Sequence, residues 1–476
     1  MRSCKVHHLL SAIAALACAV PAVPSAAGEP WTEREVAEHV DQARYTGVLE
    51  RALLDELVAR GEQLFTAKFT LGDGAGRPEA TLAILPTKRK RTATKRFQRI
   101  AGLDANACSS CHNDPVPGGA GDFPVNVFVS EGFTFEDLDS TDQQFSNERN
   151  TNHLMGSGLV ELLAREMTAE LQTQRRQAIE KARASGETVE VALTTKGVDF
   201  GRLTAHADGT VGLDGVDGVD ADLVIRPFSQ KGVMTSLRQF TINALNQHHG
   251  MEASERFGPR WTDEADFDGD GVTQEITAGD VSAMVAWQAS RPPPLQQVPD
   301  DAGWRQAAAR GDTLFDSYGC ASCHMRALPL ESLRFTDPGP YDTAGTLSTA
   351  EVDDAAVYDL ALLDWHGGLK RNDDGAWLVP LFGDLKRHKM VDLQVSALGN
   401  ELLSQRFVER DVFQTAELWG IGSTAPYGHR GDMTTLDEVI RAHGGDARQA
   451  RDRYVDAADA DRSALIAFLK TLVIEQ

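Results

Sequence analysis

The sequence predicts a mainly α-helical protein built from two domains of one type, the first of which is enlarged by a small β meander. A hexapeptide that begins at Arg60 (RGEQLF) recurs at Arg310 (RGDTLF), and each copy precedes a pair of cysteines. Leu and Ala recur at helical spacing between residues 159 and 184, with charged residues between them. The repeat therefore predicts the two domains, and the spacing predicts that helices dominate.

The strands and the final helices can be placed from shorter patterns. Runs at 189–193, 198–205 and 210–211 alternate or favour strand residues and are separated by turn signals, so they predict the meander within the first domain. Residues 435–472 have helical spacing that is interrupted at Gly444-Gly445, which predicts two helices in the tail.

Length and composition are those of a globular protein. The chain has 476 residues, of which 42% are hydrophobic and 25% are charged, so disorder and fibrous repeats are excluded. Its 47 Lys and Arg residues are outnumbered by 70 Asp and Glu residues, and the net charge is -23. This acidic balance argues against an anionic membrane surface as the main partner, and we expect no nucleic-acid partner.

The N-terminal segment, 1–27, has the pattern of a secretory signal peptide. Arg2 and Lys5 precede an apolar run, and small residues follow up to Ala27, after which we expect cleavage. A lipoprotein signal that uses Cys18 is the alternative. No later stretch reaches the roughly 18 apolar residues that span a bilayer. The sequence therefore predicts an exported chain without a transmembrane segment.

The two domains are expected on either side of a Pro-rich linker. We place the N-terminal domain at 28–290, the linker at 291–303 and the C-terminal domain at 304–476. Three successive prolines at 292–294 cannot continue a helix and favour an extended chain, which supports a boundary at this point.

Four of the six cysteines form two CxxCH motifs. The motifs consist of Cys108, Cys111 and His112 and of Cys320, Cys323 and His324. This spacing is the attachment signal for c-type haem, because each thiol adds to one haem vinyl group and the adjacent imidazole binds the iron. A zinc site would need four ligands in one cluster, and a redox CxxC pair has no use for the histidine.

Each domain is therefore expected to be a cytochrome c-like haem domain with one covalently bound haem c. His112 and His324 are the expected iron ligands. Because covalent haem attachment takes place outside the cytoplasm, the motifs agree with the signal peptide and predict a periplasmic protein.

Four segments carry a resemblance to a known family: residues 104–122, 149–151, 248–251 and 418–429. Together they resemble the bacterial di-haem c-type oxidoreductase family of peroxidase-like proteins, which is distantly related to the di-haem cytochrome c peroxidases. The resemblance covers roughly residues 55–474 and implies an oxidoreductase that passes electrons between two haems across a domain interface. Peroxide is the implied substrate, and a small redox protein or a quinol-linked donor is the implied partner. A non-catalytic di-haem electron-transfer cytochrome is the alternative.

The resemblance also suggests a second ligand for the second haem. Aligned from Thr435, His443 falls where the related peroxidases place the methionine ligand of their electron-storing haem. We therefore expect His443 to bind the iron opposite His324. A histidine that is stabilised at a helix C-terminus by the helix dipole is the alternative.

The first haem is the expected site of the reaction. Its distal side is expected around His248, His249 and Met251 and the helix entered between Arg149 and Glu161. The sequence leaves open whether His249 or Met251 binds the iron or borders an open site. Glu161 is the candidate proton acceptor, and Arg149 the candidate for assisting O–O cleavage, although both residue types are commonly structural at such positions. The sequence departs from the peroxidases at Glu161 and the two leucines after it, where they carry an aromatic pair with Trp.

Residues 266–272 have the pattern of the first half of a calcium loop, with carboxylates at alternate positions and glycine at the sharp turn. Thr277 occupies the twelfth position, where such loops carry Glu. The expected ligands of one calcium ion are Asp266, Asp268, Asp270, the Val272 carbonyl, and Glu275 or Asp280. An acidic turn without an ion is the alternative.

Residues 88–99 hold seven basic residues and no acidic one. Such a run is usually a solvated loop. The functional alternatives are a docking arm for an acidic partner and a clamp for the propionates of the first haem, since guanidinium groups pair well with carboxylates.

Overall fold

The computed structural model describes residues 31–79, 86, 88–97, 104–129, 146–401 and 407–475. Residues 33–476 are grouped by their contacts into one compact unit. The expected signal peptide lies outside the described residues. Within the described ranges, none of the helices combines the length and the apolar character needed to cross a membrane.

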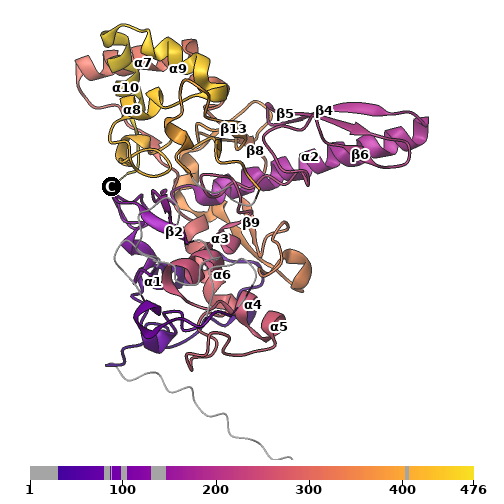
Figure 1. The fold of residues 1–476 in the computed structure, drawn as a ribbon, viewed down its shortest axis with the longest axis vertical. Coiled ribbons are helices and arrows are strands. Elements are labelled where there is room, and N and C mark those ends of the chain that lie inside the picture. The colour runs from indigo at the N-terminus through magenta and orange to yellow at the C-terminus, as the bar shows by residue number, and fades with distance from the viewer. Residues whose placement is uncertain are drawn as a thin grey trace, which may run out of the picture. The chain divides into compact units, whose positions relative to one another are not determined.

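The described part of the chain is mixed rather than mainly α-helical: 38% of its residues are helical, and it has small sheets of two or three strands (Figure 1). The helices are α1 (Arg51–Thr66), α2 (Ser157–Ser185), α3 (Leu237–Ala244), α4 (Ser254–Phe257), α5 (Pro259–Thr262), α6 (Ala278–Ala289), α7 (Ala302–Ser317), α8 (Leu436–Arg441), α9 (Arg448–Val455) and α10 (Asp459–Leu469). A π-helical turn, η5 (Leu245–His249), continues α3.

The strands are mostly short, which is why hydrophobic periodicity did not reveal most of them. They are β1 (Gly47–Val48), β2 (Val125–Val129), β3 (Ser146–Arg149), β4 (Val189–Thr195), β5 (Val198–Ala205), β6 (Val211–Gly212), β7 (Leu295–Gln296), β8 (Leu328–Leu330), β9 (Arg334–Asp337), β10 (Ala356–Asp359), β11 (Lys370–Arg371), β12 (Trp377–Val379), β13 (Arg387–Lys389), β14 (Val412–Gln414) and β15 (Leu472–Val473).

The long helix and the meander lie where the sequence predicted them. Helix α2 covers the expected span, and the antiparallel sheet β4-β5-β6 packs against it (Figure 1). Thr168 ties α2 to the chain after the sheet, because its hydroxyl accepts the N–H of Ile225 at 2.9 Å. The meander is therefore an addition built on one helix.

The repeated hexapeptides lie at equivalent points of two helix pairs. Helix α1 packs against α6, and α7 packs against α10. A Cβ atom at Gly61 would lie 2.0 Å from the carbonyl oxygen of Ala283, and one at Gly311 would lie 2.0 Å from that of Ala464. The glycine of each hexapeptide therefore permits backbone contact between two helices.

The phenylalanine that ends each hexapeptide also packs in the same way in both copies. Phe65 packs on Trp287 with ring centroids 4.2 Å apart, and Phe315 packs on Phe468 with centroids 5.5 Å apart. Each pair joins the same two helices as the glycine contact. The sequence repeat is thus a structural repeat of a helix pair.

Packing does not divide at the expected linker. Buried apolar side chains between residues 328 and 381 belong to the core that contains α1, α2 and α6, whereas the second core is formed by α7, α8, α10 and parts of residues 382–472. Strand β1 pairs in parallel with β10, and β7 pairs with the C-terminal strand β15. The segment at 295–296 is therefore held in a sheet, and part of the expected 304–476 domain completes the core of the first.

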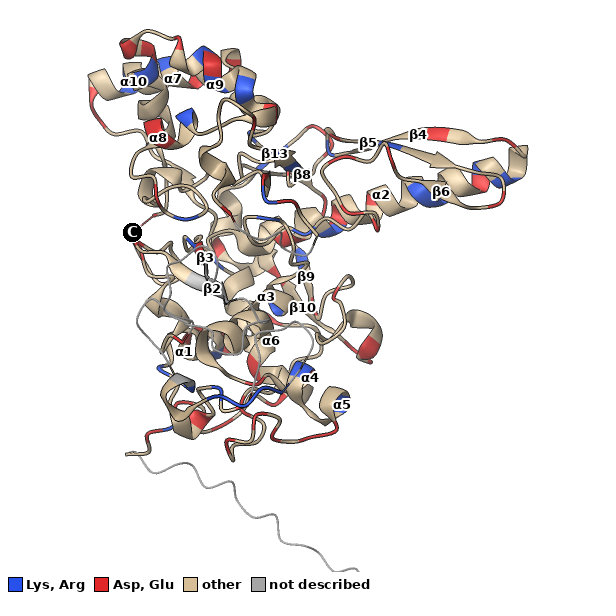
Figure 2. Cartoon of the chain, in the orientation of Figure 1, with Lys and Arg blue, Asp and Glu red and all other residues tan. Residues whose placement is uncertain are grey.

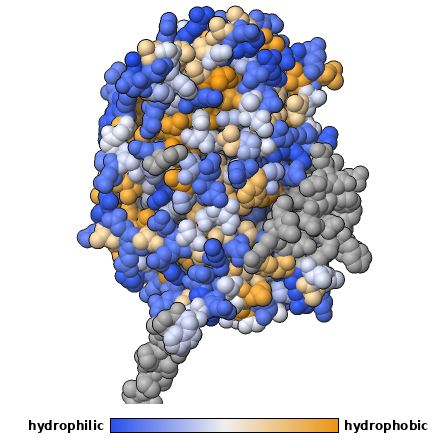
Figure 3. All heavy atoms as spheres, turned by 90° about the vertical axis from the view of Figure 1, so that its left-hand side faces the viewer, coloured by the Kyte–Doolittle hydropathy of each residue, from blue (hydrophilic) through white to orange (hydrophobic). Residues whose placement is uncertain are grey.

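The face shown in Figure 3 is mostly hydrophilic, with smaller apolar patches between the polar residues.

Candidate functional site

The two cysteine motifs form the same local turn. Each begins with a short 3-10 helix, η4 (Cys108–Ser110) or η6 (Cys320–Ser322). The N–H of His112 donates to the Cys108 carbonyl at 3.1 Å, and the N–H of His324 donates to the Cys320 carbonyl at 3.0 Å. Helix α1 contacts η4 and α7 contacts η6, so the structural repeat includes both motifs.

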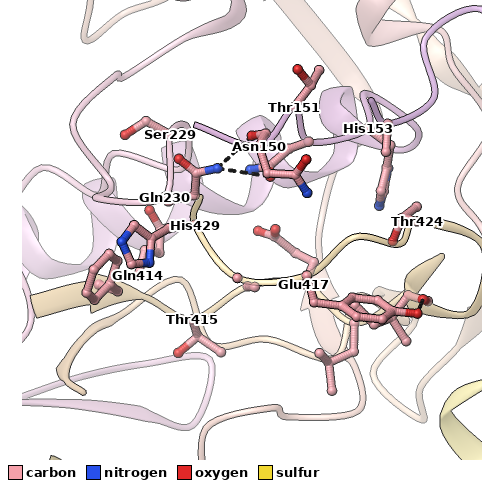
Figure 4. Close-up of a pocket in the computed structure, with 18 of the residues that line it drawn as sticks. Asn150, Thr151, His153, Ser229, Gln230, Gln414, Thr415, Glu417, Thr424 and His429 are labelled. Atoms are coloured by element: carbon pink, nitrogen blue, oxygen red, sulfur yellow. Dashed lines mark hydrogen bonds between the residues drawn. The ribbon is translucent and has the colours of Figure 1, made fainter. Parts of the chain in front are cut away.

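One cavity of about 720 Å³ is lined by both motifs. The motif residues that line it are Cys108, Cys111, His112, Cys320, Cys323 and His324. Polar side chains from distant segments also line this cavity (Figure 4). The Gln230 amide donates to the Asn150 carbonyl at 2.9 Å, and the Asn150 N–H donates to the His429 carbonyl at 2.9 Å. The segments around residues 150 and 429 therefore meet in the cavity wall.

His324 and His443 both line this cavity at its second motif. Nδ1 of His443 lies 2.6 Å from the Val439 carbonyl oxygen, and Nδ1 of His324 lies 3.2 Å from that of Phe382. Because a carbonyl only accepts hydrogen bonds, Nδ1 carries the proton in each ring and Nε2 keeps its lone pair. Burial lowers the pKa of both imidazoles, that of His324 to about 4. Both rings are therefore neutral, which is the form that binds a metal.

His112 and His249 line the cavity at its first motif. His249 ends the π-helical turn η5, a rare element that often occurs at functional sites. Its Nδ1 lies 2.8 Å from the Ala105 carbonyl oxygen, and its Nε2 lies 3.5 Å from Sγ of Cys108. Burial lowers the pKa of both rings to about 4. The structure thus places a second neutral imidazole beside the first motif.

Met251 is not among the residues that line the cavity, so the structure gives no support to its expected place beside the first haem. Its side chain is fully buried in the first hydrophobic core. The left-handed turn at Gly250 (φ 66°) separates it from the π-helical turn, and its N–H donates to the Leu245 carbonyl at 3.0 Å. His248 and His249 are the residues of this segment that reach the cavity.

Of the two expected catalytic residues on the Arg149-to-Glu161 segment, only Arg149 lines the cavity. Its guanidinium is buried and forms an ion pair with Glu401. Glu161 points elsewhere: it pairs with Arg165 and accepts the N–H of Leu237, the first residue of α3, at 2.7 Å. A carboxylate at a helix N-terminus is a structural contact. These contacts give no support to the expected role of Glu161 as the proton acceptor.

Two titratable cavity residues were missed by sequence reasoning. His429 is buried, both of its ring nitrogens lack a hydrogen-bond partner, and burial lowers its pKa to about 2. Glu417 also lines the cavity, and burial raises its pKa to about 7. Figure 4 shows both side chains in the cavity wall. Both residues lie in or beside the 418–429 segment that carries the resemblance, but no motif assigns a role to either.

The cysteines fit covalent haem better than the other chemistries of a CxxC pair. Cys108, Cys111, Cys320 and Cys323 are all free of disulfide bonds. Burial raises the pKa of the Cys108 thiol to about 12 and that of Cys111 and Cys320 to about 11, so these thiols are not reactive thiolates. The cavity has thiols at each motif and neutral imidazoles around them, which is the donor set that a haem c requires.

The acidic loop brings its carboxylates together. Ligand oxygens of Asp266, Asp268 and Asp270 lie within 4.8 Å of one another. Asp268 also forms a second such group with Glu252 and Glu275, and all three of these residues are buried. Figure 2 shows acidic residues on the loop that leads from α5 to α6. No sequence pattern pointed to Glu252, which precedes the loop and lies outside its pattern of alternate carboxylates.

The remaining expected ligands of the loop, Glu275, Asp280 and Val272, do not all lie at the carboxylate cluster. Asp280 is held elsewhere, because its carboxylate accepts the N–H groups of Val40 at 3.0 Å and Thr277 at 2.9 Å and so caps α6. Of the two alternatives, the structure brings Glu275 to the loop and not Asp280. The N–H of Val272 donates to Asp270 at 2.6 Å, which shapes the turn.

The basic run lies near this loop, as far as its residues are described. The Lys88 ammonium pairs with Glu264 and lies 5.0 Å from the centroid of the Phe267 ring. Among the described residues at 88–97, none lines the cavity. A clamp for haem propionates is therefore not supported by these residues, and docking of an acidic partner stays a prediction. Residue 99 lies outside the described ranges.

Residues 375–472 match a protein family described as "Di-haem oxidoreductase, putative peroxidase". No curated protein matches the chain. The chain is similar to the solved structure of Kuenenia stuttgartiensis hydrazine synthase pressurized with xenon, with 14% identity, coverage of 98% of this chain and 100% of that one, and a TM-score of 0.36. It is also similar to a MauG-like protein associated with microbial copper homeostasis, with 14% identity, coverage of 65% and 89%, and a TM-score of 0.28.

The family match confirms the resemblance over the range that contains Glu417, His429 and His443. It supports a haem-based redox function.

Proposed function

We propose that this chain is a periplasmic di-haem c-type oxidoreductase that reduces a peroxide with electrons passed from one haem to the other. The observation that carries this proposal is the single cavity that both CxxCH motifs line. Haems held by these motifs would both border this cavity, which is the arrangement that electron exchange between them would need. A small redox protein or a quinol-linked donor would supply these electrons.

The residues that would hold each haem follow from the cavity wall. Cys108, Cys111 and His112 would hold the first, and Cys320 and Cys323 with His324 and His443 would hold the second. A bound haem supplies an iron that takes up and releases single electrons. The Val439 and Phe382 carbonyls orient the imidazoles of the second site, since each fixes the proton on Nδ1 and leaves Nε2 for the metal.

Arg149 and His429 are the chain's own candidates for the peroxide chemistry. Reduction of hydrogen peroxide breaks the O–O bond, consumes two electrons and two protons, and yields two water molecules. His429 can accept a hydrogen bond from the peroxide, because it is neutral and its ring nitrogens have no hydrogen-bond partner. Glu417, whose pKa burial raises to about 7, also lines the cavity and can exchange a proton near neutral pH. Arg149, held by Glu401, places a positive charge at the cavity wall where negative charge develops on oxygen.

The second candidate function is electron transfer without catalysis. It is favoured by the position of His249, whose Nε2 faces the first motif as a candidate sixth ligand. If His249 and His443 both bind iron, neither haem has a site open to substrate. The two functions therefore differ in the coordination of the first haem.

The test begins with the haem content and the spin state. Pyridine haemochrome assay of the periplasmic fraction is expected to give two covalently bound haems per chain, on a protein whose N-terminus is Gly28. Electron paramagnetic resonance is expected to show one high-spin ferric haem that becomes low-spin with cyanide. Stopped-flow mixing of the reduced protein with hydrogen peroxide is expected to give rapid oxidation. Two low-spin haems and slow oxidation would leave electron transfer as the function.

A further inference from the structure

Three buried carboxylates meet beside the π-helical turn. Each of them has one oxygen without a hydrogen-bond partner: Oε1 of Glu252, Oδ2 of Asp268 and Oε1 of Glu275. The exposed fractions of Glu252, Asp268 and Glu275 are 6%, 0% and 2%, respectively. Among the described residues, no Lys, Arg or His forms an ion pair with any of the three; the Lys88 ammonium, whose charge acts on Glu252, is paired with Glu264. Burial of several unpaired negative charges is strongly unfavourable unless a cation neutralises them.

Backbone groups hold these carboxylates in place. The N–H of Phe267 donates to Glu252 at 3.1 Å, that of Glu252 donates to Glu275 at 2.6 Å, and that of Asp270 donates to Asp268 at 3.1 Å. In each carboxylate, the N–H donates to one oxygen, and the other oxygen is the one without a hydrogen-bond partner. The orientation of each carboxylate is therefore fixed. One oxygen from each of the three carboxylates lies within 4.8 Å of one from the others.

We propose that Glu252, Asp268 and Glu275, together with Asp266 and Asp270, bind one calcium ion that fixes the turn carrying His249. The ligands are all oxygens, which excludes a preference for zinc or copper and suits a hard cation. Five carboxylates, four from one irregular loop and one from the segment before it, fit the high coordination number and flexible geometry of Ca²⁺ better than the strict octahedron of Mg²⁺.

The link to His249 is short and runs through the backbone. Only Gly250 and Met251 separate His249 from Glu252. The Gly76 N–H donates to the His249 carbonyl at 3.0 Å. A Cβ at Gly74 would lie 2.2 Å from the Glu275 carboxyl carbon, so the chain at residues 74–76 touches both the ion ligands and the turn. An ion that orders Glu252 and Glu275 therefore also orders the segment that positions His249.

Calcium binding itself is tested on the purified full-length protein after treatment with chelator and dialysis. Isothermal titration with CaCl₂ is expected to show one site per chain, with at least tenfold weaker binding of MgCl₂. Glu252→Gln and Glu275→Gln should each weaken calcium binding at least tenfold. Glu264→Gln, at an exposed residue of the same loop, should leave it unchanged. Absence of calcium binding to the wild-type chain, or equal affinity in all three variants, would overturn the proposal.

The variants are expected to fold, because glutamine keeps the size of glutamate and removes charge repulsion; circular dichroism checks this. The wild-type titration tests the site even if one variant does not fold.

The effect on His249 rests on the proposed haem function and is measured separately. Removal of calcium from the holoprotein is expected to alter the absorption and resonance spectra of the first haem, and His249→Ala should abolish that calcium dependence. Calcium binding without any spectral change would disprove the coupling and leave the ion site. A chain without covalent haem would disprove the proposed function, while its calcium titration would still decide the ion site.

Discussion

The contact between α7 and α10 gives a prediction whose size can be worked from distances. A Cβ at Gly311 would lie 2.0 Å from the Ala464 carbonyl oxygen and 2.8 Å from Cβ of Phe468. Because contacts under 3.0 Å essentially never occur, Gly311→Ala requires the helices to separate by about 1 Å. The obstacle is backbone, so no side chain can rotate away. Overpacking of this kind costs about 1–3 kcal/mol, and the upper end applies here.

The helix propensity of alanine recovers about 1 kcal/mol of this cost. We therefore expect Gly311→Ala to destabilise the folded protein by about 2 kcal/mol. The control is Gly367→Ala, where a new Cβ would have no neighbour within 4 Å and the stability should change little. Urea unfolding followed by circular dichroism measures both variants. Equal midpoints for Gly311→Ala and Gly367→Ala would refute the reasoning about the helix contact.

Three further predictions concern the sites. His443→Met should raise the reduction potential of the second haem in a potentiometric titration, because a thioether stabilises ferrous iron more than an imidazole does; an unchanged potential would exclude His443 as a ligand. His429→Ala should lower the rate of peroxide reduction at least tenfold and leave both haem spectra intact, whereas Glu161→Gln should leave that rate within twofold of the wild type in stopped-flow assays. Glu161→Gln should instead weaken the dependence of the folded protein's stability on pH. Burial raises the pKa of Glu161 to about 7, so the unfolded chain releases this proton at lower pH than the folded one, and the wild type loses stability as pH rises from about 4.5 to 7. Thermal melts over this range should show a smaller loss in the variant, and parallel curves would contradict the assignment.

The sequence could predict features that depend on local spacing. The haem motifs, the long helix α2 and the meander β4 to β6 follow from motif spacing and periodicity, and the structure has the same elements at those positions. The short strands could not be predicted, because two or three residues carry no period and their pairing depends on distant partners. The pairing of β1 with β10, for example, joins Gly47 to Ala356.

The candidate site shows the same limit. Arg149 and Glu161 both lie on segments expected near the first haem, yet only Arg149 reaches the cavity. The direction of a helix face cannot be read from the sequence when both faces are buried, as they are at the start of α2. Met251 and His249 differ in the same way, since one left-handed glycine between them turns one side chain into the core and leaves the other in the cavity. Glu252 could not be found because its partners come from a separate, later loop.

The shared core explains how two repeated units can hold one cavity. Each helix pair packs through a glycine contact of its own, so each could form without the other. The segment at 328–381 leaves the second unit soon after its cysteine motif, packs into the core of the first, and returns at Phe382, whose side chain lies in the second core and whose carbonyl accepts the His324 Nδ1–H. A displacement of this segment would therefore move the carbonyl that orients the His324 ring. Residues 328–382 thus connect the two sites through the chain and through packing, in addition to the cavity that both sites line.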